Sequence, residues 1–233
     1  MAPGARYDAI ADLYAAAVGD NVVDSVAACL LDLLGPVRGR RVLDLACGQG
    51  RLSRELARRG ATVVGCDLSN ALLEKARAAE VADRLDIDYI HVDAASQSAL
   101  AGETFDVVVS HFGLSDIDDL DGTLATACRV LRTRGRFVFS ILHPCFPGWG
   151  EDAPSSWPPG EGYFTEGWWL ASNTGFRGKV GANHRTLSTY LNTLIRHGLE
   201  IEQVAEPEPG GEWARSKPGP PPPVFLVMRC SRR

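Results

Sequence analysis

Short apolar runs alternate with amphipathic segments through the middle of the chain, from residue 41 to residue 142. Continuous apolar runs are typical of strands buried on both faces, and their alternation with helices predicts a doubly wound, mostly parallel α/β sheet. Ligands of such sheets bind beyond the carboxyl ends of the strands. The expected strands lie near 42–46, 62–66, 87–92, 105–110 and 135–142, and the expected helices near 51–59, 69–79 and 118–131.

The regions before and after 41–142 have different patterns. Apolar positions in 7–34 recur at helical spacing, which predicts two helices and an N-terminal helical cap over 1–37. The segment 143–183 is rich in proline, glycine and tryptophan, shows no clear helix or strand, and is expected to be an irregular lid. The region 184–233 is expected to hold a helix beginning at His184 and strands at 199–204 and 224–228, with the proline run 218–223 before the last strand.

Composition limits the class of protein. The chain has 233 residues, 45% of them apolar, which suffices for a single domain over 1–233. A formal charge of −5 offers no general basic surface, so nucleic acid is not expected as a partner. None of the six cysteines forms a CxxC pair, so no metal site is expected and a reducing cytoplasm fits. No apolar run approaches the ~20 residues of a membrane span or the core of a signal peptide.

The most informative motif lies where the first expected strand ends. The apolar run breaks at Gly48 and Gly50, and a helix follows, so a ligand can approach bare backbone near a helix N-terminus. Asp67 follows at about the ~20-residue spacing at which a carboxylate meets a ribose. However, Ser53 stands where the third glycine of the dinucleotide fingerprint would lie, and Asp44 would repel a pyrophosphate. The motif therefore predicts an adenosine-containing cofactor that carries positive charge.

These residues resemble the class I S-adenosylmethionine-dependent methyltransferases, of small-molecule type. The resemblance covers roughly 41–142 and implies a Rossmann-like, seven-stranded sheet in which the last two strands form an antiparallel hairpin. Ala46 replaces the first glycine of the family's glycine run. The matching stretches are Asp44-Leu-Ala-Cys-Gly-Gln-Gly50, Asp67-Leu-Ser69, Asp93-Ala94, Phe105-Asp-Val-Val-Val-Ser110 and Leu131-Arg-Thr-Arg-Gly-Arg-Phe-Val-Phe-Ser140.

The resemblance implies a set of residues that bind S-adenosylmethionine. Asp67 would accept hydrogen bonds from both ribose hydroxyls, with a helix N-cap as the alternative role. Asp93 would accept from the adenine amino group, with a turn aspartate as the alternative. Tyr14, on the first helix, would cover the cofactor unless it only packs in the core. The other expected contacts come from Asp44, which would act indirectly, and from Ala46, Gly48, Leu68, Ala94 and Ser110.

Two histidines at strand ends are candidates for the catalytic base. Methyl transfer from a sulfonium mainly requires alignment and exclusion of water, and a base is needed only if the nucleophile holds a proton. His111 follows the fourth strand and His143 the fifth, and a hydrogen-bonded structural role is the alternative for each. Trp149, Trp157, Trp168 and Trp169 in the lid favour a flat or aromatic acceptor, unless they only anchor the lid.

The sequence thus predicts a methyltransferase that modifies oxygen, nitrogen or carbon of a small molecule, favouring an aromatic one. It is expected to act in secondary metabolism, as a monomer or homodimer. Two alternatives stay open. A non-catalytic S-adenosylmethionine-binding protein would keep Asp67 and Asp93 but block the pocket beside the methyl group. An NAD-dependent oxidoreductase would bind NAD instead of S-adenosylhomocysteine.

Overall fold

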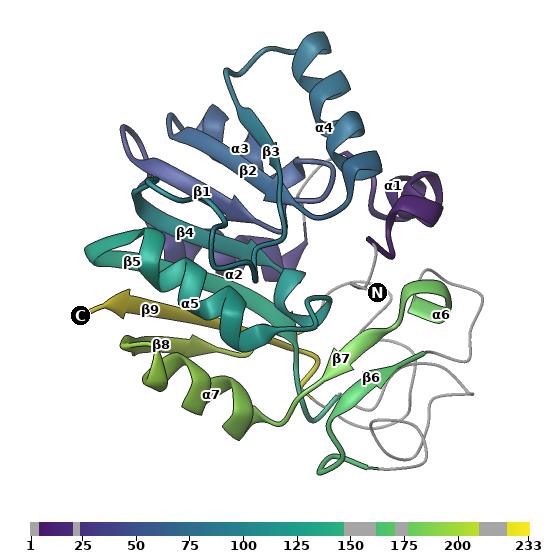
Figure 1. Ribbon diagram of the computed structural model, residues 1–233, viewed down its shortest axis with the longest axis vertical. Coiled ribbons are helices and arrows are strands. Elements are labelled where there is room, and N and C mark those ends of the chain that lie inside the picture. Colours follow the sequence, from purple (N-terminus) through teal and green to yellow (C-terminus); the bar gives the residue numbers. More distant parts are fainter. Residues whose placement is uncertain (1–4, 21–23, 147–161, 171–176, 210–222) are drawn as a thin grey trace.

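A computed structural model of the chain describes residues 5–20, 24–146, 162–170, 177–209 and 223–233. Its centre is a seven-stranded sheet with the order β3-β2-β1-β4-β5-β9-β8 (Figure 1). The strands β1 to β5 are parallel, and β9 runs antiparallel to both β5 and β8. The predicted sheet and its terminal antiparallel hairpin are therefore confirmed. The strands are β1 Arg41–Leu45, β2 Thr62–Asp67, β3 Asp88–His91, β4 Phe105–His111, β5 Leu131–Leu142, β8 Leu199–Ala205 and β9 Phe225–Arg232.

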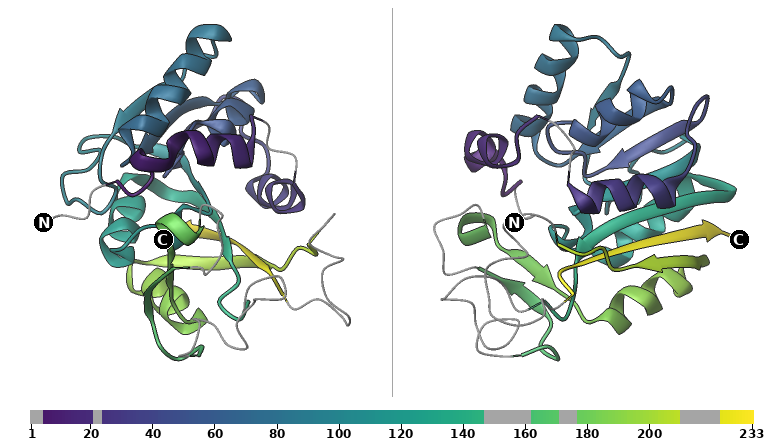
Figure 2. Two further views of the ribbon diagram at one scale, coloured as in Figure 1. Left: turned by 90° about the vertical axis from the view of Figure 1, so that its right-hand side faces the viewer. Right: turned by 180° about the vertical axis from the view of Figure 1, so that it is seen from behind.

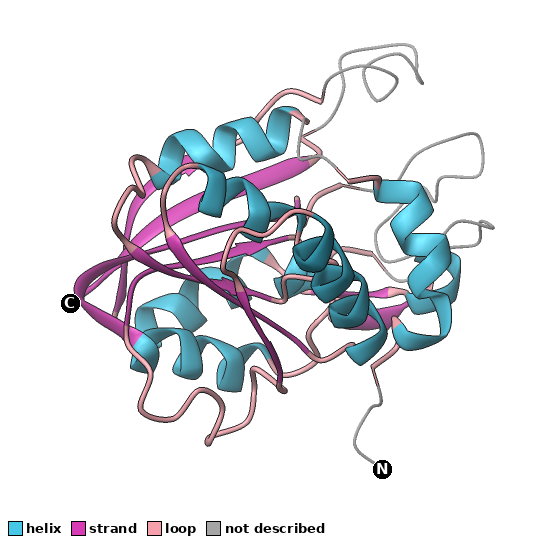
Figure 3. Ribbon diagram, turned by 90° about the horizontal axis from the view of Figure 1, so that it is seen from above, coloured by secondary structure: helices cyan, strands magenta, loops and turns pink. Residues whose placement is uncertain are grey.

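Helices cover both faces of this sheet, as Figure 3 shows. Apolar side chains of α5 and α7 pack on one face, and those of α2 and α3 pack on the other. Residues of the two apolar clusters, one on each face, alternate along the same strands, because successive strand side chains point to opposite faces. The helices are α1 Ala11–Val18, α2 Ser25–Leu34, α3 Arg51–Arg58, α4 Asn70–Ala82, α5 Leu120–Val130, α6 Arg177–Val180 and α7 Leu187–Arg196, with the 3-10 helices η1 Asp8–Ile10 and η2 Gly113–Ser115.

The lid contains regular structure that the sequence did not predict. Strands β6 Gly167–Trp169 and β7 Ala182–His184 pair antiparallel, and the one-turn helix α6 precedes β7. The prediction of a wholly irregular lid is therefore wrong for the described residues. Strands this short are not visible as a period-2 pattern among glycines and tryptophans.

Two element boundaries also differ from prediction. His184 closes β7 instead of opening a helix; α7 begins at Leu187, and Thr186 caps it by accepting from the Thr189 N–H. Strand β5 begins at Leu131, before the expected 135, and continues past Arg134 although that residue has a φ of 61°. Val22, Trp149, Trp157 and most of the proline run lie outside the described residues.

The N-terminal helices and the lid lie near the carboxyl ends of the parallel strands. Figures 1 and 2 show α1 beside the start of α4, and α6 with β6 and β7 beyond β5 and β9. Asp8 fixes the N-terminal segment, since its Oδ1 accepts from the Ser69 hydroxyl at 2.6 Å and from the Ala71 N–H at 3.1 Å. The N-terminal segment and the lid thus meet the loops that follow the parallel strands at one edge of the sheet.

Candidate active site

The loop between β1 and α3 has the geometry that the glycine motif predicts. Ala46, Gly48 and Gly50 have φ of 59°, 55° and 79°, so the backbone turns in the left-handed region that favours glycine. A Cβ on Gly50 would collide with the hydroxyl of Tyr89, which explains why this position holds glycine. The Gly48 N–H donates to Asp67 Oδ2 at 2.7 Å, and this bond joins the glycine loop to the end of β2.

Asp67, at the end of β2, accepts backbone hydrogen bonds from two loops. Its Oδ1 accepts from the Ser69 N–H at 2.8 Å, while burial raises the pKa of the carboxyl. Ser69 caps α4 by accepting from the Leu72 N–H, so Asp67 is not that helix's N-cap. A carboxylate has about four acceptor sites, so these two backbone bonds leave capacity for ribose hydroxyls. Leu68 beside it is 40% exposed and lines the same space.

Two of the predicted cofactor residues lie beneath the loop. Asp44 is 1% exposed and accepts from the Ser53 hydroxyl at 2.5 Å, and burial raises its pKa to about 7. Ser110 is fully buried, and within the described residues its hydroxyl has no hydrogen-bond partner. Neither side chain lines the cavity.

A cavity of about 1240 Å³ opens at the carboxyl ends of the strands. Single small-molecule sites typically measure ~300–1,000 Å³, so this one has room for a cofactor and a second molecule. The predicted residues that line it are Tyr14, Ala46, Gly48, Asp67, Leu68, Asp93, Ala94 and His111.

Asp93 and Tyr14 each make a structural contact and also line the cavity. Asp93 Oδ1 accepts from the Ala95 N–H at 2.9 Å, so the carboxylate forms a turn and also faces the cavity. Tyr14 packs edge-on against Tyr7, with ring centroids 5.1 Å apart, and its ring lies 3.8 Å from a Cβ placed on Gly48. Burial raises the pKa of Tyr14 to about 12, so it is a neutral hydrogen-bonding group over the glycine loop.

The two candidate histidines have different surroundings. His143 is 5% exposed, its Nδ1 accepts from the Cys145 N–H at 3.1 Å, and its Nε2 lies 2.9 Å from Glu206 Oε1. Both ring nitrogens are therefore engaged and the ring does not line the cavity, which supports the structural alternative over a catalytic base. His111 does line the cavity, and burial lowers its pKa to about 4.

Sequence reasoning missed the residues that close the cavity. They meet on residues 113–118, called here the anchor segment, which follows β4. Asp116 accepts from the Tyr7 hydroxyl at 2.8 Å and pairs with Arg177 of α6. Asp118 receives two bonds of 2.7 Å from Arg6. The N-terminal cap and the lid therefore hold the same short segment, a convergence that no local motif encodes.

The lid tryptophans contribute to this closure. Trp168 stacks beneath the guanidinium of Arg6 at 5.4 Å and donates to the Val180 carbonyl at 3.2 Å. Neither Trp168 nor Trp169 lines the cavity. Among the described residues, no cluster of histidine, cysteine or carboxylate side chains could hold a metal ion. In that part of the chain, no helix is long and apolar enough to cross a membrane.

Comparison with known proteins identifies the family. Residues 43–139 match a family described as a methyltransferase domain. The crystal structure of an S-adenosylmethionine dependent methyltransferase from Mesorhizobium loti is 32% identical, with a TM-score of 0.70, over 89% of this chain and 98% of that one. This chain is a class I S-adenosylmethionine-dependent methyltransferase. The glycine loop, Asp67 and the cavity fit S-adenosylmethionine, the cofactor of the family.

Other relatives either match part of the sequence or share only the fold. A ubiquinone biosynthesis O-methyltransferase from Rhizobium rhizogenes is 40% identical over 108 residues, which are 46% of this chain and 43% of that protein. The chain thus spans less than half the length of that curated relative. The magnesium protoporphyrin IX methyltransferase of Synechocystis PCC 6803, with a TM-score of 0.63 and 16% identity over 97% of this chain and 96% of that one, shares the fold.

Proposed function

We propose that this methyltransferase transfers a methyl group to a small-molecule acceptor, favouring an aromatic one, in secondary metabolism. The cavity carries the proposal, because its volume exceeds that of one ligand and two separate covers enclose it. S-adenosylmethionine supplies the methyl group as an electrophilic sulfonium when bound. The formal charge of −5 supports a small molecule over nucleic acid.

The cofactor occupies the half of the cavity above β1, β2 and β3 in this proposal. Asp67 holds the ribose hydroxyls and Asp93 the adenine amino group, because carboxylates pair well with such donors. Leu68 and Ala94 supply apolar contact, and Tyr14 covers the glycine loop. Asp44 and Ser110 support that loop from below, and Ala46 and Gly48 leave space at its surface.

The acceptor occupies the half near the ends of β4, β5 and β9. His111 provides a polar group there, and Phe112, Leu142 and Phe225 provide apolar walls. The rings of Phe112 and Phe225 lie 5.8 Å apart, which suits a flat apolar molecule. Oxygen, nitrogen and carbon nucleophiles all remain compatible with this wall, and the curated relatives named O-methyltransferases favour oxygen.

The location and assembly of the enzyme belong to the same proposal. All six cysteines are free thiols, which supports the cytoplasm, where thiols stay reduced. We expect a monomer or a homodimer.

Ligand binding and turnover test the proposal together. S-adenosylhomocysteine should raise the melting temperature and NAD should not; binding at a hundredfold excess over Kd stabilises the native state by about 2.7 kcal/mol. Formation of S-adenosylhomocysteine from S-adenosylmethionine is then followed with catechols, hydroxybenzoates, aromatic amines and transfer RNA. Turnover of the small aromatic compounds supports the proposal. Binding without turnover of any acceptor would favour the non-catalytic alternative, and turnover of RNA alone would contradict the acceptor class.

A further inference from the structure

A buried hydroxyl on β5 contacts the ring of His111. Ser140 is fully buried, and its Oγ lies 2.7 Å from His111 Nδ1. The Phe112 N–H donates to Ser140 Oγ at 3.2 Å and to the Ser140 carbonyl oxygen at 3.0 Å. Within the described residues, the Ser140 hydroxyl has no hydrogen-bond partner besides these two.

Counting protons decides the direction of the bond between Ser140 and His111. A serine hydroxyl has one proton to donate and two lone pairs to accept. If His111 Nδ1–H donated to Oγ, the hydroxyl proton would be buried without an acceptor, which costs as much as a lost hydrogen bond. If the hydroxyl donates to Nδ1, it still accepts from Phe112 and every group is satisfied. The neutral imidazole then carries its proton on Nε2.

His111 lines the cavity, and the Nε2 side of its ring has no hydrogen-bond partner within the described part of the chain. Phe112, next to His111, has a φ of 63°, which is unusual for a bulky residue. Three influences act on the charge of His111: burial lowers its pKa most, Asp24 at the start of α2 raises it, and Arg51 at the start of α3 lowers it. The ring is therefore neutral at neutral pH.

We propose that Ser140 is a positioning residue that fixes His111 as a neutral N–H donor toward the cavity, and that this donor selects acceptors whose oxygen enters as a phenolate or enolate. This inference rests on the proposed function and narrows its acceptor class. A donor hydrogen bond favours an oxygen anion over a hydroxyl that still needs deprotonation.

The chemical step then needs no base in the site. The acceptor loses its proton to solvent before binding, and His111 Nε2–H holds the resulting oxygen anion. A lone pair of that oxygen forms the new O–C bond while the C–S bond breaks and returns its electron pair to sulfur. The products are a neutral ether and S-adenosylhomocysteine, and no proton passes to His111. This role differs from the general base that the sequence suggested.

The tautomer of His111 can be measured without any acceptor. In nitrogen-15 NMR spectra of the full chain, His111 Nδ1 should be unprotonated and Nε2 protonated near neutral pH, with His111→Gln assigning the signals. Ser140→Ala should shift the tautomer balance, and Ser140→Thr, which keeps the hydroxyl, should not. An Nδ1–H tautomer in the wild type would overturn the proposal even if the variants fail to fold.

A rate measurement tests the acceptor class. With a catechol and a nitrocatechol, kcat/KM should rise with pH at the pKa of each phenol, so the two profiles should be displaced. Ser140→Ala should lower kcat and leave the KM for S-adenosylmethionine unchanged. His111→Gln, which keeps a donor, should lose far less than the ~100- to 10,000-fold expected on removal of a general base.

The contrary results are equally distinct. A rise at one common pH for both phenols, abolished in His111→Gln, would show that His111 is a base and overturn the inference. Absence of turnover with all phenols would overturn the phenolate class. Turnover of aromatic amines in that case would leave the proposed function standing, so the two failures are distinguishable.

Discussion

The cofactor side and the cover side of the cavity are held together in different ways. On the cofactor side the bonds join residues close in sequence: Asp44 and Ser53 are 9 residues apart, and Gly48 and Asp67 are 19 apart. On the cover side the bond from Arg6 to Asp118 spans 112 residues.

The two sides of the cavity therefore depend on different parts of the chain. The bonds of the glycine loop belong to one continuous strand-helix-strand unit, β1-α3-β2, so their geometry forms with that unit. The cover side exists only when the N-terminal cap, the anchor segment and the lid all meet. We therefore expect substitutions on one side to leave the other nearly unchanged, with Gly113 as the exception because it touches both.

The largest expected effect comes from the anchor segment. Asp116→Ala should promote opening of α6 and β7 by about 3 kcal/mol, the low end for breaking a buried ion pair, since both partners are about 20% exposed. Hydrogen exchange of amides in 177–184 measures this opening. The double variant Asp116→Asn/Arg177→Met should recover most of the loss, because no charge then lacks its partner. Unchanged exchange in Asp116→Ala would show that the lid does not depend on this pair.

The cofactor side should respond to Asp67→Ala. Affinity for S-adenosylhomocysteine should fall by about 1.5–3 kcal/mol, the range for hydrogen bonds to a charged group. Calorimetric titration gives the affinity, and exchange in 177–184 should remain as in the wild type. Asp86→Ala is the matched control, because that carboxylate is exposed. Wild-type affinity in a folded Asp67→Ala protein would remove the ribose role.

Gly113→Ala should affect both sides. A Cβ at Gly113 would lie 2.5 Å from the Cβ of Ala46 and 2.8 Å from the Ser110 hydroxyl, and such overpacking costs about 1–3 kcal/mol. Urea unfolding and cofactor titration should both report a loss. The double variant Ala46→Gly/Gly113→Ala should recover stability, since Ala46 also has a φ of 59°. A double variant no better than the single would contradict this contact.

The pH dependence of unfolding should separate two buried groups, one beneath the glycine loop and one at the end of β4. The pKa of Asp44 rises from 3.8 to about 7 on folding, so its contribution is full below pH 3.8 and is lost as pH rises through 7. The pKa of His111 falls from 6.5 to about 4, so its contribution is present above pH 6.5 and is lost as pH falls through 4.

These two contributions oppose each other between pH 4 and 6.5, and single variants reveal them. Relative to the wild type, Asp44→Asn should make the unfolding free energy rise more with pH, and His111→Gln should make it rise less. Urea unfolding at several pH values measures the slopes. Identical slopes in all three proteins would show that neither group is shifted by folding.

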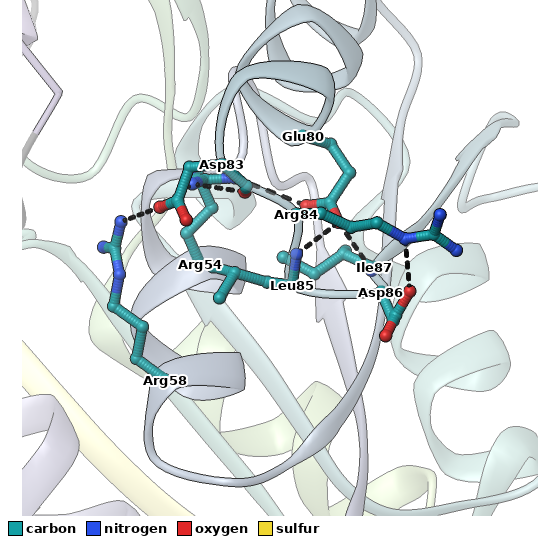
Figure 4. Close-up of polar contacts among 8 residues, drawn as sticks. All are labelled: Arg54, Arg58, Glu80, Asp83, Arg84, Leu85, Asp86 and Ile87. Carbon is teal, nitrogen blue, oxygen red and sulfur yellow. Dashed lines mark hydrogen bonds and ion pairs between the residues drawn. The ribbon is translucent and has the colours of Figure 1, made fainter.

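The smallest effect should come from a surface ion pair distant from both sides. Figure 4 shows Arg84 bonded to Asp86 near the turn before β3. Both side chains are about 80% exposed, so Arg84→Ala should leave the melting temperature unchanged. Arg54, 10% exposed and bonded to Glu80 and Asp83 in the same network, should give a measurable loss when changed to alanine.

Sequence reasoning succeeded where the evidence lies within one continuous unit. The order of strands and helices from β1 to β5, the glycine turn and the position of Asp67 all follow from local periodicity and spacing, and the structure agrees. The short strands β6 and β7 escaped prediction because three residues show no period. Neither Trp168 nor Trp169 lines the cavity, and Trp168 donates a hydrogen bond within the lid instead.

The sequence by itself determined the fold class, the family and the cofactor loop, because apolar periodicity and glycine conformation act over a few neighbouring residues. Tertiary structure decided which distant side chains share the cavity. His111 and His143 both follow strands and are equivalent as sequence. In the structure, His111 lines the cavity and contacts Ser140 through Nδ1, while Cys145 and Glu206 engage both nitrogens of His143. A histidine's role depends on the partners of its two nitrogens, and packing supplies those partners from distant parts of the chain.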